Sequence, residues 1–408
     1  MRAVDIIGVG MTPFGRHVDK SHTELAQAAV RMALADAGAD ADALDTTIYA
    51  NVVQGFVAGE MSIPGEYALR PLGVKGVRAF HVEAACASGT MALHLAFDLI
   101  RSGIADVVLA VGVEKLYVED RVKRFAVFQQ PNDVEVARRY IELTGSRLAP
   151  VPPGCETQGP NVLMEAYAAQ ARLHMATYGT TARDFAAVSA KNHVHSQHNS
   201  LSQYRNPMTI EEVLAAPPVA WPLTAPMCAP ISDGAAAALV CASDARKRFA
   251  GAAPVRILSA RSLTGQDRDA ADYSRHVTRL VSARAFEDAG IGPKDVDLAE
   301  VHDASSSGEV IQVEALGLSR PGEAGADARS GALSLGGRTP VNVSGGLVSK
   351  GHPLGATGLA QIYELVSQLR GRCGGRQVEG ARIALAENSG GFYSVEDAMS
   401  CVTILTHG

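Results

Sequence analysis

Two stretches of the chain carry apolar residues at the three-to-four-residue spacing of an amphipathic helix. They cover residues 25–37 and 277–289, and a glycine follows each one, Gly38 or Gly290, as is common at helix C-termini. A short polar linker and a strand-like run come next, at 46–52 in the first case and 298–302 in the second. The pattern predicts one helix–strand unit in each half of the chain.

These two units also share residues. Five positions of the first unit recur in the second with identical spacing: Ala33, Asp36, Ala37, Gly38 and Asp45 match Ala285, Asp288, Ala289, Gly290 and Asp297. A second matching pair follows, with a helix and a strand over 86–100 and 107–111, and again over 352–369 and 382–385. The chain therefore reads as a duplicated α/β protein with two βαβαβ halves, which predicts mostly parallel sheets covered by helices.

The two halves differ in what lies around these units. The helix over 86–100 is apolar nearly all round, which predicts a central, buried position. Residues 117–230 are polar, proline-rich and irregular, and a strand pattern returns at 233–241. We therefore predict three domains: an N-terminal half (1–116 and 231–250), an inserted loop or lid domain (117–230) and a C-terminal half (251–408).

Composition narrows the class of protein. The 408 residues are 47% apolar and 20% charged, as expected for a globular protein with more than one core. No run reaches the roughly 18 apolar residues of a spanning helix, and no signal peptide is evident, so we expect a cytoplasmic protein without a membrane span. A net charge of −6 without a basic cluster argues against nucleic acid as a partner.

The cysteine spacing bears on redox and metal chemistry. The chain has six cysteines and no Cys-x-x-Cys pair, which argues against a disulfide framework and against a structural metal site. We therefore expect no metal and free thiols, of which one or two are reactive.

Cys86 is the first candidate for chemistry, because it stands between a predicted strand and a predicted helix. The positive end of a helix dipole would lower the pKa of this thiol and favour the nucleophilic thiolate. The alternative from position alone is a small core residue.

His352 occupies the equivalent place in the second half, within a glycine-rich stretch. If a pseudo-twofold axis relates the halves, the two helix starts meet, and His352 and Cys86 share one pocket as base and thiol. The alternative is a turn with a capping histidine.

His302 stands at the C-terminal end of a predicted parallel strand, where α/β sheets bind ligands. Asn388 to Gly391 end another strand and could offer amides to an oxyanion.

Taken in order, these segments resemble the active-site blocks of a known family. Cys86-Ala87-Ser88-Gly89, His302-Asp303, Gly351-His352-Pro353 and Asn388-x-Gly390 are similar to the four blocks of the thiolase superfamily. Ser232 to Ala236 and the stretch from Asn342 to Gly358 also match, so the resemblance spans the chain. A His-Asp block in place of Asn-Glu points to the sterol-carrier-protein-type branch, which includes acetyl-CoA acetyltransferases.

The resemblance implies a fold and a reaction. The fold would be a five-layer αβαβα sandwich. Cys86 would be acylated by acyl-CoA, His352 would act as its base, and His302 would complete a first oxyanion hole. The amides of Cys86 and Gly390 would form a second oxyanion hole. The acyl group would pass to CoA (thiolysis) or to a carbon nucleophile (Claisen condensation) in lipid metabolism. Acyl-CoA would be the substrate, without a tightly bound cofactor, and the protein would be a homodimer or homotetramer.

The chain departs from the family at the second catalytic cysteine. Its two possible positions hold Asn388 and Ala304, followed by Ser305. Glu387 or a nearby serine could substitute: Ser305, Ser306 or Ser389. The departure leaves two alternatives open: a condensing subunit that needs a partner with a zinc ribbon and an OB fold, or a non-catalytic scaffold in such a complex. CoA-binding residues are unassigned; the basic residues of the insert, Arg121, Lys123 and Arg124, fit substrate contact and solvated surface equally well.

Overall fold

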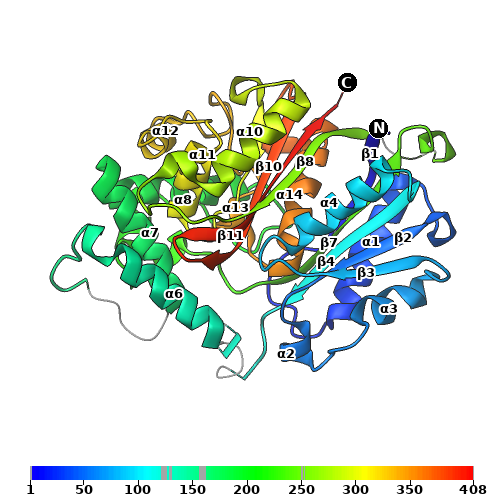
Figure 1. The fold of residues 1–408 in the computed structure, drawn as a ribbon, viewed down its shortest axis with the longest axis horizontal. Coiled ribbons are helices and arrows are strands. Elements are labelled where there is room, and N and C mark those ends of the chain that lie inside the picture. Colours follow the sequence, from blue (N-terminus) through cyan, green and yellow to red (C-terminus); the bar gives the residue numbers. More distant parts are fainter. Residues whose placement is uncertain are drawn as a thin grey trace.

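The structure is a computed structural model, and it describes residues 2–120, 126–127, 131–155, 162–249, 251 and 253–407 (Figure 1). Nine strands form one sheet in the order β3-β2-β4-β7-β1-β8-β11-β10-β9. Their bounds are β1 Val4–Met11, β2 Thr46–Ala50, β3 Arg78–Val82, β4 Val107–Lys115, β7 Asp233–Ala242, β8 Val255–Thr264, β9 Leu298–Glu300, β10 Ile383–Tyr393 and β11 Glu396–Thr406. Two short strands, β5 Pro218–Ala220 and β6 Leu223–Thr224, pair separately.

Helices pack against this sheet, in two outer layers and in a middle layer between its two halves. In the described part of the chain they are α1 His22–Ala37, α2 Gln54–Ala58, α3 Pro64–Leu69, α4 Ser88–Arg101, α6 Pro131–Thr144, α7 Val162–Tyr178, α8 Ala182–Ser196, α9 Ile210–Ala215, α10 Val277–Ala289, α11 Ser306–Ala315, α12 Ala324–Ser330, α13 Gly346–Lys350 and α14 Thr357–Leu369. None of them is both long enough and apolar enough to cross a membrane.

The layers follow from which helix touches which strands. Helix α1 packs on β1 and β7, and α10 packs on β8 and β11, so these two helices form the outer layers. Helices α4 and α14 contact each other and strands of both halves, and they form the middle layer. Their side chains belong to one buried cluster with the strands on either side, which includes Leu93, Phe97, Leu359 and Leu365. The α/β sandwich with a buried central helix pair is therefore confirmed.

The expectation of mostly parallel sheets is wrong. Strands β3, β2 and β4 are parallel, as are β9 and β10, but β4–β7, β7–β1, β1–β8, β8–β11 and β11–β10 are antiparallel. The halves join where Val4 of β1 lies opposite Ile257 of β8. Strand β10 turns directly into β11, and such a tight connection forces an antiparallel pair. The repeated residues lie in the helix–strand units. They therefore did not predict the pairing directions of β1, β7, β8 and β11, which form the antiparallel pairs.

The duplicated residues make equivalent contacts in the two halves. The Asp45 carboxylate accepts the N–H groups of Asp106 and Val107 at the start of β4. The Asp297 carboxylate accepts those of Arg382 and Ile383 at the start of β10. Gly38 and Gly290 end α1 and α10 in the left-handed conformation, with φ of 61° and 68°. The shared sequence pattern therefore encodes a shared capping arrangement.

The inserted segment is helical, which corrects the expectation of an irregular loop. It contains α6, α7, α8 and α9, and α7 and α8 pack on α11, α12 and α13 of the second half. Figure 1 shows these green helices beside the yellow ones. Pro150, Pro152 and Pro153 lie between α6 and α7, and Pro217 follows α9, so the prolines interrupt the links rather than the helices.

We expect Asp297→Ala to lower the free energy of unfolding by about 1–3 kcal/mol, because two backbone N–H groups at the start of β10 lose their acceptor. Asp45→Ala should have an effect of similar size in the first half. Urea denaturation followed by circular dichroism measures both. Asp42→Ala is the matched control: because the Asp42 side chain is exposed, its removal should change the free energy of unfolding by less than about 0.5 kcal/mol. Equal stability of all three variants would contradict the capping role.

Candidate active site

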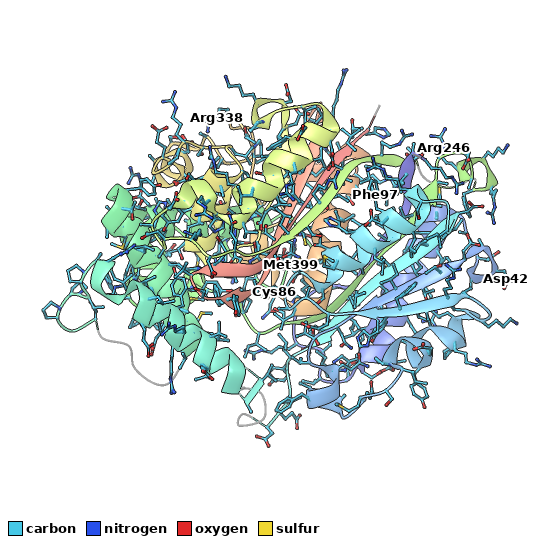
Figure 2. All side chains as sticks on the ribbon, in the orientation of Figure 1. Asp42, Cys86, Phe97, Arg246, Arg338 and Met399 are labelled. Atoms are coloured by element: carbon cyan, nitrogen blue, oxygen red, sulfur yellow. The ribbon has the colours of Figure 1, made fainter. Side chains whose placement is uncertain are left out.

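Cys86 lies in a tight loop between β3 and α4, near the middle of the molecule (Figure 2). The Ser88 hydroxyl accepts the N–H of Ala84 at 2.8 Å and donates to the carbonyl of Ala85 at 2.7 Å. Ala85 has a φ of 49°, a left-handed conformation that costs a non-glycine residue free energy. Helix α4 begins at Ser88 rather than at Cys86, so the thiol precedes the helix. The loop fixes the backbone around Cys86, and the residue as a whole is partly buried.

The structure brings His352 to this sulfur. The distance from His352 Nε2 to Cys86 Sγ is 3.2 Å. On the other side of the ring, Nδ1 lies 2.7 Å from the Thr357 hydroxyl oxygen, and that hydroxyl donates its only hydrogen to the Pro353 carbonyl. Nδ1 must therefore carry the ring proton, and Nε2 presents a lone pair to the thiol. The sequence did not indicate Thr357, because only the fold places its hydroxyl beside the ring.

His302 completes a group of three. Its ring centroid lies 5.2 Å from that of His352, in an edge-on arrangement. Its backbone N–H donates to the Glu387 carboxylate at 3.0 Å, whereas its buried Nε2 has no hydrogen-bond partner among the described residues. The Cys86 sulfur and one ring nitrogen from each histidine all lie within 4.8 Å of one another. The three residues come from the loop before α4, the segment after β9 and the turn before α14.

Burial controls the protonation of this group. It raises the pKa of the Cys86 thiol to about 12, although the N–H of Gly391 opposes the shift by hydrogen bonding to the sulfur. It lowers the pKa of His302 to about 4 and that of His352 well below its ordinary value, where His302 and Lys350 add repulsion. The expected lowering of the thiol pKa by the helix is therefore wrong, because desolvation outweighs it. At neutral pH the resting pair is thiol and neutral imidazole.

Asn388 supports the nucleophile loop. Its side-chain amide donates to the Cys86 carbonyl and to the Thr90 hydroxyl, both at 3.0 Å. We expected this residue to end a strand, and that expectation is wrong. Asn388 lies inside β10, opposite Cys401, because the chain stays extended up to the β10–β11 hairpin. A Cβ on Gly390 would lie 2.2 Å from the Ala84 carbonyl oxygen, so β10 presses directly on the loop.

The candidates for the missing acid/base group have other partners. Ser305 caps α11 through the N–H of Gly308, and Ser389 donates to Glu387 at 2.7 Å. Glu387 in turn accepts the His302 N–H, which ties it to the backbone. The buried hydroxyl of Ser306 has no partner among the described residues. Ser305, Ser389 and Glu387 therefore make internal hydrogen bonds, and their use in place of the second cysteine stays a prediction.

Glu114 is a further residue that the sequence analysis missed. It is fully buried at the end of β4, and its carboxylate accepts the N–H groups of Val52, Val53 and Gly355. Gly355 follows His352 by three residues, so Glu114 ties the histidine-bearing turn to the first half of the chain. Burial raises the pKa of Glu114 to about 7. Its carboxylate form, with three acceptor bonds, therefore predominates only above that pH.

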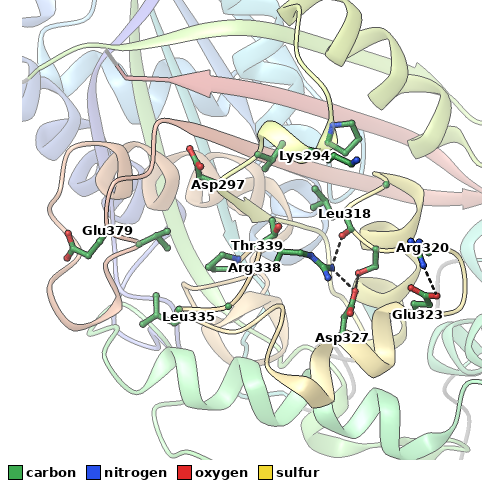
Figure 3. A pocket seen from close by; sticks show the side chains of 18 of the residues that line it. Lys294, Asp297, Leu318, Arg320, Glu323, Asp327, Leu335, Arg338, Thr339 and Glu379 are labelled. Carbon is green, nitrogen blue, oxygen red and sulfur yellow. Dashed lines mark hydrogen bonds and ion pairs between the residues drawn. The ribbon is translucent and has the colours of Figure 1, made fainter.

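A large surface cavity lies elsewhere. Its volume is about 990 Å³, and it lies around Asp297, Leu318 and Arg338 (Figure 3). Arg338 is already paired with Asp327 at 2.7 Å, and no predicted site residue lines the cavity. It therefore does not belong to the site around Cys86. Arg121, Lys123 and Arg124, which we considered for substrate contact, lie outside the described residues.

Comparison with known proteins gives the family. The thiolase N-terminal domain model matches residues 4–213, and the model described as thiolase C-terminal domain-like matches residues 261–406. The chain belongs to the thiolase family. It is an acyltransferase of this family.

Two curated relatives extend over nearly the whole chain. Acetyl-CoA acetyltransferase of Methanothermobacter thermautotrophicus is 37% identical over 96% of this chain and 97% of the relative. Sterol carrier protein 2 of Rattus norvegicus is 35% identical over 95% of this chain and 70% of the relative. Among solved structures, the one titled "Ltp2-ChsH2(DUF35) aldolase" has a TM-score of 0.77 and 23% identity, and covers 99% of this chain and 98% of its own. That likeness shows the fold.

We expect Glu114→Gln to lower the acyl-transfer rate by about 10- to 100-fold, because the turn that carries His352 loses part of its anchor. In the wild type the rate should fall as the pH drops below about 7, since protonation removes an acceptor from Glu114. The neutral glutamine cannot titrate, so the variant should lose this acid limb. Rate measurements from pH 5.5 to 9 test both points. An unchanged acid limb in Glu114→Gln would contradict the assignment.

Proposed function

We propose that Cys86 carries the acyl group and that His352 is the base that activates it. The observation that supports this most directly is the 3.2 Å contact between His352 Nε2 and Cys86 Sγ, with Thr357 holding the proton on the opposite ring nitrogen. A thiol beside an unprotonated imidazole nitrogen is the arrangement that nucleophilic catalysis by cysteine requires.

The proposed reaction has two steps. In the first, the Cys86 sulfur attacks the carbonyl carbon of an acyl-CoA while its proton moves to His352 Nε2. The bond from the carbonyl carbon to CoA sulfur then breaks, and the CoA thiolate takes the proton from His352. In the second step, the α-carbon of another acyl-CoA loses a proton to His352 Nε2 and attacks the carbonyl carbon of the Cys86 thioester. The bond from that carbon to the Cys86 sulfur breaks, the sulfur takes the proton from His352, and the result is a Claisen condensation. Thiolysis is the reverse: the Cys86 sulfur attacks the 3-keto carbon of a 3-ketoacyl-CoA, the bond from that carbon to the α-carbon breaks, the α-carbon takes the proton held by His352, and CoA then takes the acyl group from Cys86.

The proposed oxyanion sites follow from the donors around the sulfur. His302 Nε2 is buried and has no protein partner among the described residues, so as an N–H it would be free to donate to a substrate oxygen beside His352. We assign the second site to the amides of Cys86 and Gly390. The Gly391 amide hydrogen-bonds to the sulfur and is an additional donor at this site.

We expect acetyl-CoA to acetylate Cys86, adding the mass of one acetyl group to its peptide. His352→Ala should slow this acylation by about 100-fold or more, because the thiol loses its base. Rapid quenching and peptide mass spectrometry measure the rate. Cys228→Ala is the matched control, since Cys228 is also a partly exposed thiol whose pKa burial raises to about 12. No adduct on Cys86 with any of several acyl-CoAs would favour the scaffold alternative.

A second candidate is a condensing subunit that needs a partner protein. Asn388 and Ala304 occupy the positions of the family's second cysteine, so this chain lacks that thiol acid. The similar solved structure is titled as a complex with a DUF35 protein, which favours a small partner of that kind. This candidate predicts that the chain alone acylates Cys86 but turns over only when the partner is added.

We further propose that the protein is a homodimer joined through β3. β3 is an edge strand of the sheet, and its residues from Arg78 to His81 are exposed. One row of its backbone N–H and C=O groups is therefore available to pair with another strand. Large apolar side chains nearby are exposed as well, on or before α3: Met61, Ile63 and Tyr67. Because β3 leads directly to the Cys86 loop, the same contact would stabilise the nucleophile.

We expect Phe80→Glu to convert the dimer into a monomer, because it places charges on both copies of an apolar edge. Met32→Glu is the matched control: Phe80 is 39% exposed and Met32 is 40% exposed, but Met32 lies on α1. Sedimentation equilibrium at micromolar concentration gives the masses. A monomeric wild type, or a dimer that survives Phe80→Glu, would contradict the proposed interface.

We also propose three domains: an N-terminal half (1–116 and 231–250), an inserted domain (117–230) and a C-terminal half (251–408). We propose a cytoplasmic location as well. The division is supported by β7, which returns between β4 and β1 after the insert. Limited proteolysis tests the boundaries.

A further inference from the structure

The group of Cys86, His302 and His352 has a property that acyl transfer does not require. Its sulfur and two ring nitrogens lie within 4.8 Å of one another, and each residue offers one possible ligand atom. Both histidines are at least nine-tenths buried, and Nε2 of His302 has no hydrogen-bond partner among the described residues. Three possible ligand atoms therefore lie close together around a buried, unpartnered ring nitrogen.

The chemistry of these atoms selects a class of cation. Thiolate sulfur and imidazole nitrogen suit zinc and other first-row transition metals, whereas magnesium and calcium prefer oxygen ligands. An imidazole binds metal through a ring nitrogen that carries no proton. Thr357 holds the His352 proton on Nδ1, so Nε2 is ready as a ligand, with the outer hydrogen bond that metal-bound histidines usually have.

We propose that Cys86, His302 and His352 form a zinc-binding site that competes with acylation. Binding would replace the sulfur–hydrogen bond of Cys86 with a sulfur–zinc bond and release one proton to water. The metal would have three protein ligands, which leaves the fourth position of a tetrahedral set for water. A sulfur bound to zinc cannot attack a thioester, so zinc would act as a reversible inhibitor. The site itself rests on geometry; only the inhibition rests on the proposed function.

Isothermal titration calorimetry with zinc chloride tests the site directly. We expect one zinc per chain, with proton release shown by a dependence of the heat on the buffer's ionisation enthalpy. Cys86→Ala and His302→Ala should each weaken binding by more than about tenfold, and Thr357→Val by about tenfold. Cys228→Ala should bind like the wild type, and magnesium should give no binding heat. Equal zinc affinity in the wild type and Cys86→Ala would overturn the proposal.

A second measurement separates this proposal from the proposed function. The wild type is incubated with acetyl-CoA, with and without one equivalent of zinc, and acetylation of Cys86 is followed by mass spectrometry. A fall of more than about tenfold that a chelator reverses supports inhibition. Zinc binding without any acetylation of Cys86 would retain the metal site and overturn the catalytic role. Acetylation at an unchanged rate with zinc bound would overturn the competition.

Discussion

The site depends on a close approach of two backbones in the middle of the molecule. Gly355, three residues after His352, lies against β4 and the start of α4. A Cβ on Gly112 would lie 2.1 Å from the Gly355 carbonyl oxygen, and one on Gly89 would lie 2.7 Å from the same atom. Real side chains do not fit at such distances. Gly89 and Gly112 therefore allow the turn that carries His352 to lie beside the helix that follows Cys86.

Buried charged residues also stabilise the segment that leads into the His352 turn. Lys350 is fully buried, and its ammonium group contacts the Glu300 carboxylate at 3.2 Å and the Ser344 hydroxyl at 2.7 Å. Asn192 of α8 donates to Asp303, next to His302, at 2.8 Å. Removing one member would leave a buried charge or polar group unpaired, which is costly. Asn192 of the inserted helix α8 thus supports the segment that carries His302, and Ser196 of the same helix contacts Ser349, three residues before His352.

The protonation pattern fits a site that creates charge only during reaction. A thiolate and an imidazolium would each be costly in this buried position, so burial raises the pKa of Cys86 and lowers that of His352. Donors placed where charge develops, such as the Gly391 amide, then matter most for catalysis. The side-chain amide of Asn388 also stabilises the nucleophile loop, because it donates to the Cys86 carbonyl and to the Thr90 hydroxyl.

Local patterns in the sequence were enough to predict α10 from Val277 to Ala289, its Gly290 cap and the duplication, because helix periodicity and capping depend on nearby residues. The order of the motifs around Cys86, His302 and His352 likewise indicated the family. The mixed strand directions, the helical insert, the high thiol pKa and the roles of Thr357 and Glu114 became apparent only in the folded chain. Each of these depends on burial or on partners far away in sequence, and a one-dimensional pattern records neither.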